Sequence, residues 1–313
     1  MDINLYTPHA SLSVSSLTGL ENLKTEDLFE ILHLTRLCKR SRKAGENTAA
    51  LEGKIIASVL DLPSVRTRAA LELAVKRAGG DVVELPMVSE REKSGESLFD
   101  IVLSLETFGF DAFFIRTNDQ KELQRIASAV KKPVVNGMTS TRHPTQVLSD
   151  LFTIWERTGK LAEKKLAYVG RPTAVTNSLL IGAAKCGMSV SVACPQDKFP
   201  PREIVECALQ YGEVLLTENV AEAVRGADVV YTDGYADLNF SDRDEESRAF
   251  ADYCVTESVM ALAKPEALFM HTLPVTRGKE AEDAVLSSKN SAVLEQTENR
   301  LFTMQALLAL LTK

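Results

Sequence analysis

The 313-residue sequence has little of several features that assign a chain quickly to a class of protein. Aromatic residues make up only 6% of it. No apolar stretch approaches the roughly 20 residues that cross a bilayer, and the most apolar tail runs only from Leu301 to Leu311. The chain does not open with a basic start and an apolar stretch. We therefore expect neither a secretion signal nor a membrane segment.

Excess positive charge and paired cysteines are missing too. The formal net charge is −7 at pH 7, whereas nucleic-acid-binding proteins present a basic face or stripe. The five cysteines are an odd number and form no Cys-x-x-Cys pair, which argues against a disulfide framework and against a zinc site. We expect a cytoplasmic protein that binds neither nucleic acid nor a membrane and holds no metal.

Glycine motifs for nucleotides are absent as well. Gly170 follows a predicted strand, but it belongs to no Gly-x-Gly-x-x-Gly pattern, and the chain has no Walker phosphate loop. A dinucleotide-dependent dehydrogenase, which uses a similar sheet, is therefore disfavoured.

What the chain does have is a regular alternation of apolar runs and helical patterns, which is typical of α/β proteins. We expect strands at 55–60, 81–85, 112–116, 133–136, 165–169, 189–193, 228–232, 268–271 and 292–294. We expect helices at 25–43, 67–78, 97–108, 121–130, 144–157, 174–186, 201–211, 220–225, 244–253, 257–263 and 300–312. With a 45% hydrophobic content, this predicts two doubly wound parallel-sheet domains, 1–143 and 144–295, joined by an interdomain helix.

One junction between a strand and a helix in the first half predicts a phosphate site. A strand ends at Leu60, and a helix opens after Ser64 with Arg66, Thr67 and Arg68 in its first turn. The free N–H groups and the positive end of the helix dipole favour an anion there, and guanidinium groups add bidentate bonds to its oxygens. Taken alone, a helix that begins with arginines is more often a solvated surface end.

Further motifs resolve that ambiguity because they follow in the order used by one enzyme family. The chain contains Ser64-Val65-Arg66-Thr67-Arg68, Ile115-Arg116-Thr117, His143-Pro144-Thr145-Gln146, Tyr231-Thr232-Asp233, His271-Thr272-Leu273-Pro274 and Glu298-Asn299-Arg300. Together they resemble the aspartate/ornithine carbamoyltransferase family, nearest its ornithine branch. The resemblance implies an enzyme of amino-acid and arginine metabolism that moves the carbamoyl group from carbamoyl phosphate to an amine and releases phosphate. It also implies a homotrimer without a metal or organic cofactor.

The resemblance also assigns roles to residues. Carbamoyl phosphate would contact Ser64, Val65, Arg66, Thr67, Arg116, His143, Gln146, Thr272, Leu273 and Arg300, among which Arg66, Thr67, Arg116, His143, Gln146 and Arg300 would be catalytic. A neutral imidazole of His143, at the start of a helix, suits donation to the carbonyl oxygen. His271 either contacts the ligand or orients the turn before Pro274. The C-terminal helix, within 296–313, would pack back on the first domain.

The acceptor side matches the family less closely. The acceptor would contact Asn177, Asp233, Asp237 and Leu238. Thr272 stands where the ornithine branch has cysteine, Tyr235 where it has tryptophan and Asp237 where it has serine. The stretch 170–178 lacks the paired asparagines that hold the ornithine carboxylate in that branch. Two aspartates at the acceptor site favour a cationic amine, so ornithine or an ornithine-like amine is expected.

Other readings stay open on the acceptor side. Val65 and the stretch 141–144 resemble the branch that acts on N-acylated ornithines, and a diamine is a further alternative. Aspartate is disfavoured because its branch's His-Pro-Leu-Pro motif is missing. The altered acceptor loop also fits a non-catalytic paralogue that binds carbamoyl phosphate.

A polar loop, 89–97, resembles the segment that trimeric members lend to the neighbouring active site. Arg91 or Lys93 would make that contact. A plain surface loop would carry similar charges.

Overall fold

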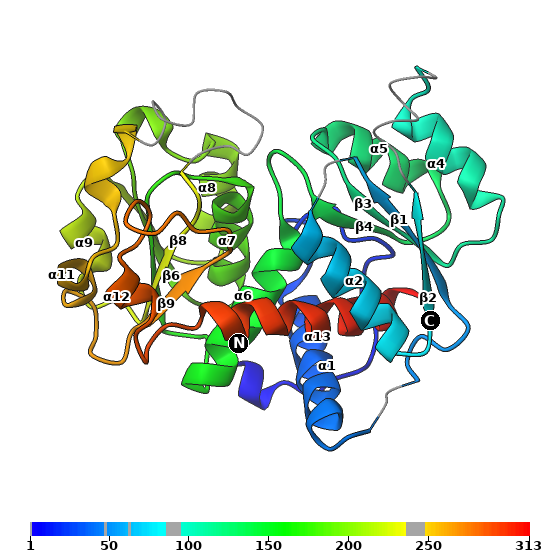
Figure 1. Cartoon of the computed structure of the whole chain (residues 1–313), viewed down its shortest axis with the longest axis horizontal. Coiled ribbons are helices and arrows are strands. Elements are labelled where there is room, and N and C mark those ends of the chain that lie inside the picture. The colour runs from blue at the N-terminus through cyan, green and yellow to red at the C-terminus, as the bar shows by residue number, and fades with distance from the viewer. Residues whose placement is uncertain (1, 47–48, 62–63, 86–94, 236–247) are drawn as a thin grey trace. The chain divides into compact units, whose positions relative to one another are not determined.

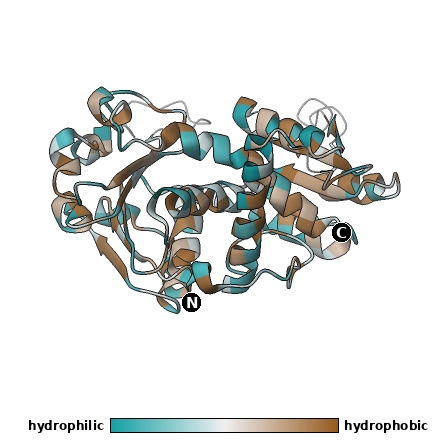
Figure 2. Cartoon of the chain, turned by 90° about the horizontal axis from the view of Figure 1, so that it is seen from below, coloured by the Kyte–Doolittle hydropathy of each residue, from teal (hydrophilic) through white to brown (hydrophobic). Residues whose placement is uncertain are grey.

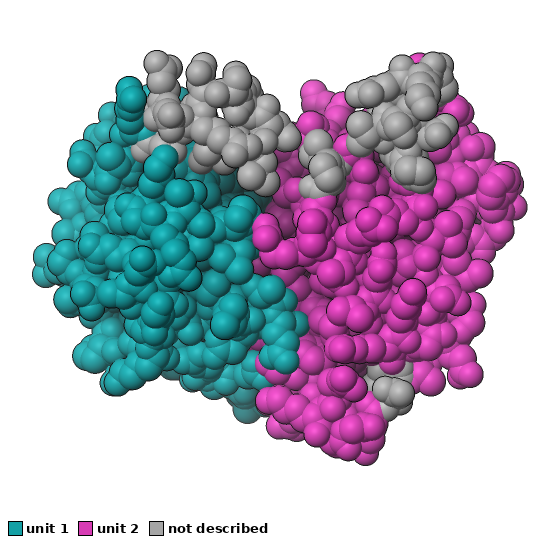
Figure 3. Space-filling model, in the orientation of Figure 1, with its two compact units in different colours: residues 1–5, 153–298 teal, residues 6–152, 299–313 magenta. Residues whose placement is uncertain are grey.

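The computed structural model describes residues 2–46, 49–61, 64–85, 95–235 and 248–313. The chain divides into two compact units (Figure 3): unit 1 comprises Met1–Leu5 and Thr153–Glu298, and unit 2 comprises Tyr6–Phe152 and Asn299–Lys313. The chain passes from one unit to the other between Leu5 and Tyr6, and again inside two helices, α6 (Pro144–Thr158) and α13 (Val293–Leu311). The domain boundaries at 143/144 and 295/296 stay a prediction.

Unit 2 is built on a parallel sheet with the strand order β2 (Asp81–Leu85), β1 (Ile55–Leu60), β3 (Ala112–Arg116) and β4 (Val134–Met138). Its helices are α1 (Thr25–Lys43), α2 (Val65–Arg77), α4 (Leu98–Glu106) and α5 (Gln120–Ala129). On one face of the sheet, Ala57 and Phe113 pack in a core with apolar side chains of α4 and α5. Ile56 and Phe114, which point to the opposite face, are also fully buried. Both faces are therefore covered, as the doubly wound prediction requires.

The end of the chain belongs to unit 2, as predicted for the C-terminal helix. Phe302 and Ala306 of α13 pack against Cys38 of α1, and Figure 1 shows α1 running across the direction of α13. The buried ammonium group of Lys39 donates to Asn299 Oδ1 at 2.7 Å. This packing places the residue that follows Asn299, Arg300, inside unit 2.

Unit 1 contains a second parallel sheet, with the strand order β7 (Val214–Thr217), β6 (Ser189–Ala193), β5 (Lys165–Val169), β8 (Val229–Thr232) and β9 (Leu268–His271). Its helices are α7 (Ala174–Lys185), α8 (Arg202–Leu209), α9 (Val220–Val224), α11 (Glu257–Met260) and α12 (Asp283–Leu286). Short 3₁₀ turns lie at Ile3–Leu5, Gln196–Lys198 and Ala251–Tyr253. Figure 2 shows mostly hydrophobic strands in both sheets, which is expected where helices cover both faces.

The prediction of strands needs two corrections, one for a strand that is wrong and one for a strand that it lacks. The strand expected at 292–294 is wrong, because α13 begins at Val293 and the Gln296 N–H donates to Ala292 O. Three apolar residues fit the first turn of a helix as well as a strand. The sequence analysis also missed β7, a strand of four residues at the sheet edge that is only partly buried. The predicted helix at 244–253 lies partly outside the described residues.

Candidate active site

The junction between β1 and α2 has the capped helix start that its sequence predicts. Ser64 is the residue before α2, and its hydroxyl accepts the Thr67 N–H at 3.4 Å and donates to Thr67 Oγ1 at 3.0 Å. The first N–H groups of a helix have no partner within it. Val65 is 84% exposed, so no side chain of the core covers its position. The junction therefore presents backbone donors and a hydroxyl at the positive end of α2.

Two buried guanidinium groups converge on the hydroxyl oxygen of Thr67. Arg116, at the end of β3, donates its Nη1 to Thr67 Oγ1 at 3.3 Å. Arg300, in α13, donates its Nη2 to the same oxygen at 3.0 Å. All three side chains are buried. Tertiary packing thus joins three parts of unit 2 that the sequence separates by up to 233 positions.

Among the described residues, no carboxylate contacts Arg116 or Arg66, and Arg116 Nε is buried without a hydrogen-bond partner. Burial, and then the Arg66 guanidinium, lowers the pKa of Arg116. Crowded cations with unsatisfied donors are the arrangement that an anionic ligand would complete.

His143 lies immediately before α6 and is buried. Its pKa is held well below the usual range of histidine, first by burial and then by the positive charges of Arg300 and Arg116. Its Nδ1 lies 3.4 Å from Thr145 Oγ1. The imidazole is therefore neutral near pH 7, as expected from its position at a helix start.

Gln146, in the first turn of α6, has a fixed orientation. Its Nε2 donates to Asp150 Oδ1 at 2.8 Å, and both side chains are buried. Its Oε1 is buried without a partner among the described residues. Because a carboxylate only accepts, it determines which end of the amide faces it. The free end of Gln146 is therefore an acceptor, suited to an N–H group of a ligand.

In unit 1, the predicted acceptor residue Asp233 follows β8 directly. Its Oδ1 accepts from Thr272 Oγ1 at 2.9 Å and from the Gly234 N–H at 2.8 Å. Its Oδ2 accepts from Thr173 Oγ1 at 2.8 Å. Sequence reasoning named Asp233 and Thr272 but missed Thr173, whose signal is a helix-capping threonine in the turn after β5.

Of the other predicted acceptor residues, the structure describes only Asn177. Asn177 is buried in the first turn of α7. Asp237 and Leu238, like Arg91 and Lys93 of the polar loop, lie outside the described residues.

Tyr235 is a core residue rather than an exposed one. Its hydroxyl donates to Tyr253 O at 2.6 Å, and its ring centroid lies 5.4 Å from that of Phe250. A Cβ atom on Gly170 would approach the Tyr235 ring to 2.4 Å, and Gly170 has φ +111°. Only glycine suits that position. Tyr235, which stands where the ornithine branch has tryptophan, therefore fills a core position beside Gly170.

His271 orients its own turn, which was one of the two roles left open. Its Nδ1 accepts the Leu273 N–H at 3.0 Å, and its backbone N–H donates to Gln296 Oε1 at 3.1 Å. The side chain is fully buried. The turn that carries Thr272 and Leu273 is thus anchored at the end of β9.

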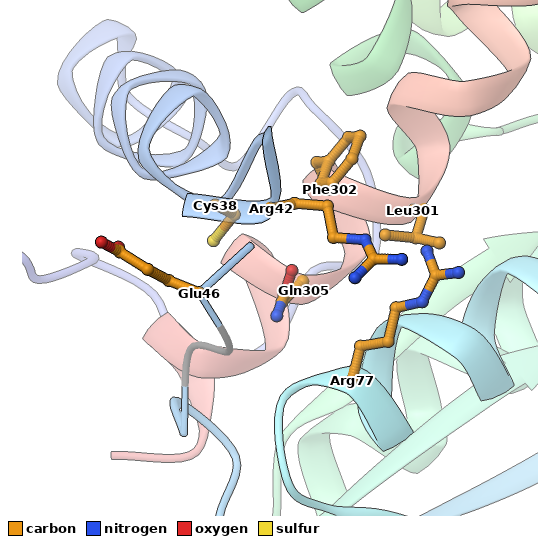
Figure 4. Close-up of a pocket in the computed structure, with 7 residues that line it drawn as sticks. All are labelled: Cys38, Arg42, Glu46, Arg77, Leu301, Phe302 and Gln305. Carbon is orange, nitrogen blue, oxygen red and sulfur yellow. The ribbon is translucent and has the colours of Figure 1, made fainter. Parts of the chain in front are cut away.

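A small cavity in unit 2 is separate from the β1–α2 junction. It is lined by Cys38, Arg42, Glu46, Arg77, Leu301, Phe302 and Gln305. Figure 4 shows the guanidinium groups of Arg42 and Arg77 pointing toward one another. Arg77 ends α2, which has 13 residues and is therefore about 20 Å long. Both arginines lie in the last turn of a helix, where the helix dipole already favours a cation.

Within the described ranges, the structure contains no group of three or more His, Cys, Asp or Glu side chains that could hold a metal ion. None of the helices described is both long enough and apolar enough to cross a membrane.

Comparison with known proteins agrees with this geometry. Residues 15–156 match the carbamoyl-P binding domain of aspartate/ornithine carbamoyltransferase, and residues 162–311 match its Asp/Orn binding domain. The anabolic ornithine carbamoyltransferase of Pyrococcus furiosus is 35% identical over 306 residues, covering 96% of this chain and 97% of that protein. The ornithine carbamoyltransferase of Symbiobacterium thermophilum is 38% identical over 299 residues, covering 94% and 96%.

Solved structures lead to the same family. The ornithine carbamoyltransferase structure from Pyrococcus furiosus superposes with a TM-score of 0.90 at 34% identity and covers 94% of this chain and 96% of that one. The one from Thermus thermophilus gives 0.87 at 31% identity, covering 96% and 99%. With both domains matched, and with relatives this similar along nearly the whole length, the chain belongs to the aspartate/ornithine carbamoyltransferase family.

Proposed function

We propose that this chain transfers the carbamoyl group of carbamoyl phosphate to ornithine and releases phosphate. The observation that carries the proposal is the convergence of Arg116 and Arg300 on Thr67, beside the free N–H groups of α2. Membership of the family and the names of the relatives support the same conclusion. We propose that residues 1–143 with 296–313 bind carbamoyl phosphate and that residues 144–295 bind the acceptor.

The phosphate group is assigned to the start of α2. The N–H of Val65 and the hydroxyls of Ser64 and Thr67 donate to its oxygens, and for this the Ser64 O–H turns away from Thr67 Oγ1. Arg66 adds a guanidinium group that no described residue engages. Arg116 reaches the phosphate from β3, and its unpaired Nε supplies a further donor. Charge-assisted bonds of this kind stabilise the phosphate as it leaves.

The carbamoyl group is assigned to side chains around α6 and α13. Neutral His143 donates to the carbonyl oxygen, and Arg300 supports the negative charge that develops on it. Gln146 Oε1 accepts an N–H of the carbamoyl group, because its amide nitrogen already donates to Asp150. Thr272 and Leu273 remain proposed contacts of the same group.

The acceptor amine attacks the carbonyl carbon as a neutral amine. The new C–N bond forms, a tetrahedral oxyanion develops, and the bond between the carbon and the phosphate oxygen breaks. The amine loses a proton and the phosphate departs with the electron pair. An alkylamine has an intrinsic pKa near 10.4, so only about one molecule in 10³ is neutral at pH 7. The transfer rate should therefore rise with pH on the alkaline side.

An acceptor panel tests the proposal. Purified protein is incubated with carbamoyl phosphate and ornithine, N-acetylornithine, putrescine or aspartate, and both phosphate and the carbamoylated product are measured. We expect ornithine to be the best substrate. Preference for N-acetylornithine or putrescine would establish one of the alternatives, and binding of carbamoyl phosphate without turnover of any amine would establish the non-catalytic paralogue.

We further propose a cytoplasmic homotrimer in which Arg91 or Lys93 acts on the neighbouring site. The thiols of all five cysteines are free, which suits a reducing compartment. Hybrid trimers test the assembly. Inactive Arg66→Ala subunits mixed with inactive loop-variant subunits should regain activity, because one site in the hybrid has both functional parts. Hybrids that form without regaining activity would refute the role of the loop.

A further inference from the structure

The Asp233 carboxylate is held from both sides by threonine hydroxyls. Asp233 follows β8, which lies between β5 and β9 in the sheet of unit 1. Thr173 follows β5 and donates to Oδ2 at 2.8 Å, while Thr272 follows β9 and donates to Oδ1 at 2.9 Å. The carboxyl ends of parallel strands share one edge of a sheet, where α/β proteins bind ligands.

Both threonines are themselves fixed. Thr173 caps α7, since its Oγ1 accepts the Val175 N–H at 3.1 Å and its backbone N–H donates to Thr176 Oγ1 at 2.9 Å. Thr272 sits in the turn that His271 anchors through Leu273. The carboxylate therefore has its position set by groups that are already ordered before any ligand arrives.

Counting hydrogen bonds shows which atoms are left for a ligand. A carboxylate offers about four acceptor positions. Among the described residues, Oδ1 of Asp233 has two donors, Thr272 and the Gly234 N–H, whereas Oδ2 has only Thr173. No described residue donates to Thr272 Oγ1, so its lone pairs are available as well. Two hard oxygen acceptors, one of them charged, suit an ammonium group.

We infer that Thr173 and Thr272 are positioning residues that clamp the Asp233 carboxylate and present it, together with Thr272 Oγ1, to an ammonium group of the acceptor; this inference rests on the proposed function. Ornithine has two amines, and one remains an ammonium group while the other reacts. The clamp therefore selects acceptors with a second cationic amine. An N-acylated ornithine lacks that cation.

The Thr272 hydroxyl matters here because it replaces a thiol in the family pattern. A thiol is a weak donor and a weak acceptor, whereas a hydroxyl is a full donor with two acceptor lone pairs. A cysteine at this place would hold the carboxylate less firmly. The hydroxyl offers an oxygen in the place of that sulfur.

The experiment compares Thr272→Val, which removes the hydroxyl at nearly constant shape, with Thr272→Ser, which keeps it. We expect Thr272→Val to raise the KM for ornithine about tenfold, from the loss of one hydrogen bond to a charged group. The KM for N-acetylornithine, which lacks the second cationic amine, should stay unchanged. Thr272→Ser should restore most of the ornithine KM.

Thr217→Val is the matched control. Thr217 also ends a strand of unit 1 and donates to a carboxylate, that of Glu222 at 2.5 Å. It lies on β7, at the edge of the sheet and two strands away from β5. Its loss should leave the ornithine KM unchanged, which separates the clamp from a general effect of losing a hydroxyl.

A double-mutant cycle with Asp233→Asn tests whether the threonine acts through the carboxylate. In the Asp233→Asn background, Thr272→Val should change the ornithine KM less than twofold, because the charge that it positions is gone. An unchanged ornithine KM in folded Thr272→Val, or a Thr272→Ser variant that behaves like Thr272→Val, would overturn the clamp. Turnover of ornithine by the unaltered protein would still uphold the proposed function in that case. No ornithine turnover by the unaltered protein would overturn both.

Discussion

The two units use the same side chain, threonine, at strand ends for opposite purposes. In unit 2, Thr67 accepts hydrogen bonds from two arginines and gathers positive charge. In unit 1, Thr173 and Thr272 donate hydrogen bonds to an aspartate and gather negative charge. A hydroxyl can do either because it is both donor and acceptor. The difference in charge matches the proposed ligands, a phosphate group for unit 2 and an ammonium group for unit 1.

The largest expected effect tests the arginines gathered at the start of α2 in unit 2. Arg66→Ala should lower kcat/KM for carbamoyl phosphate by about 10² to 10³, because it removes a donor to developing negative charge. Arg68→Ala is the control, since Arg68 is exposed and pairs with Glu72 and Glu84. Steady-state kinetics with saturating ornithine measures both. Equal losses in the two variants would show that the α2 start acts only through its net charge.

Thr67, the shared acceptor of Arg116 and Arg300, gives the next effect. Thr67→Val leaves the buried groups of Arg116 and Arg300 without their shared acceptor, at a cost of about 1 to 3 kcal/mol. We expect kcat/KM for carbamoyl phosphate to fall about tenfold or more, with Thr67→Ser close to the unaltered protein. Melting temperatures, measured alongside, show whether the loss is one of stability instead. Activity retained in Thr67→Val would mean that the arginines hold their positions without it.

The free energy of unfolding should depend on pH through His143 of unit 2, which is buried and neutral. Its pKa in the folded protein lies well below 6.5, so the unfolded chain binds more protons between those two values. The contribution of His143 to stability is therefore fully present above about pH 6.5. Below that pH the free energy of unfolding falls, by up to about 1.4 kcal/mol per pH unit from this group. Urea denaturation at pH 7.5 and 5.5 measures it. His143→Gln should show a shallower acid loss than the unaltered protein.

The smallest effect concerns Tyr235, a core residue of unit 1 that lies two positions after Asp233 in the sequence. Tyr235→Phe removes the 2.6 Å hydrogen bond to Tyr253 O and should cost about 1 kcal/mol of stability. The melting temperature should fall by a few degrees. The Kd for carbamoyl phosphate should not change, because Tyr235 belongs to unit 1. A changed Kd would show that the two units are not independent.

Much of the fold follows from the sequence, since β1 and β3 and the start of α1 lie where the pattern places them. The errors arise where local pattern is weakest. Residues 292–294 are too few to distinguish a strand from a helical turn, and β7 is a short edge strand whose burial is partial. In both cases tertiary context decides between conformations that the residues permit equally well.

The candidate site divides in the same way. The sequence by itself determined the motif around Arg66, the order of the later motifs and the carboxylate at Asp233, because each is set by residue type and by position next to a strand end. Only the tertiary structure decided that Arg300 shares Thr67 with Arg116 and that Thr173 holds Asp233. These hydrogen bonds join residues that are far apart in the chain. Only tertiary packing brings such residues together, because local propensity acts on neighbours in the sequence.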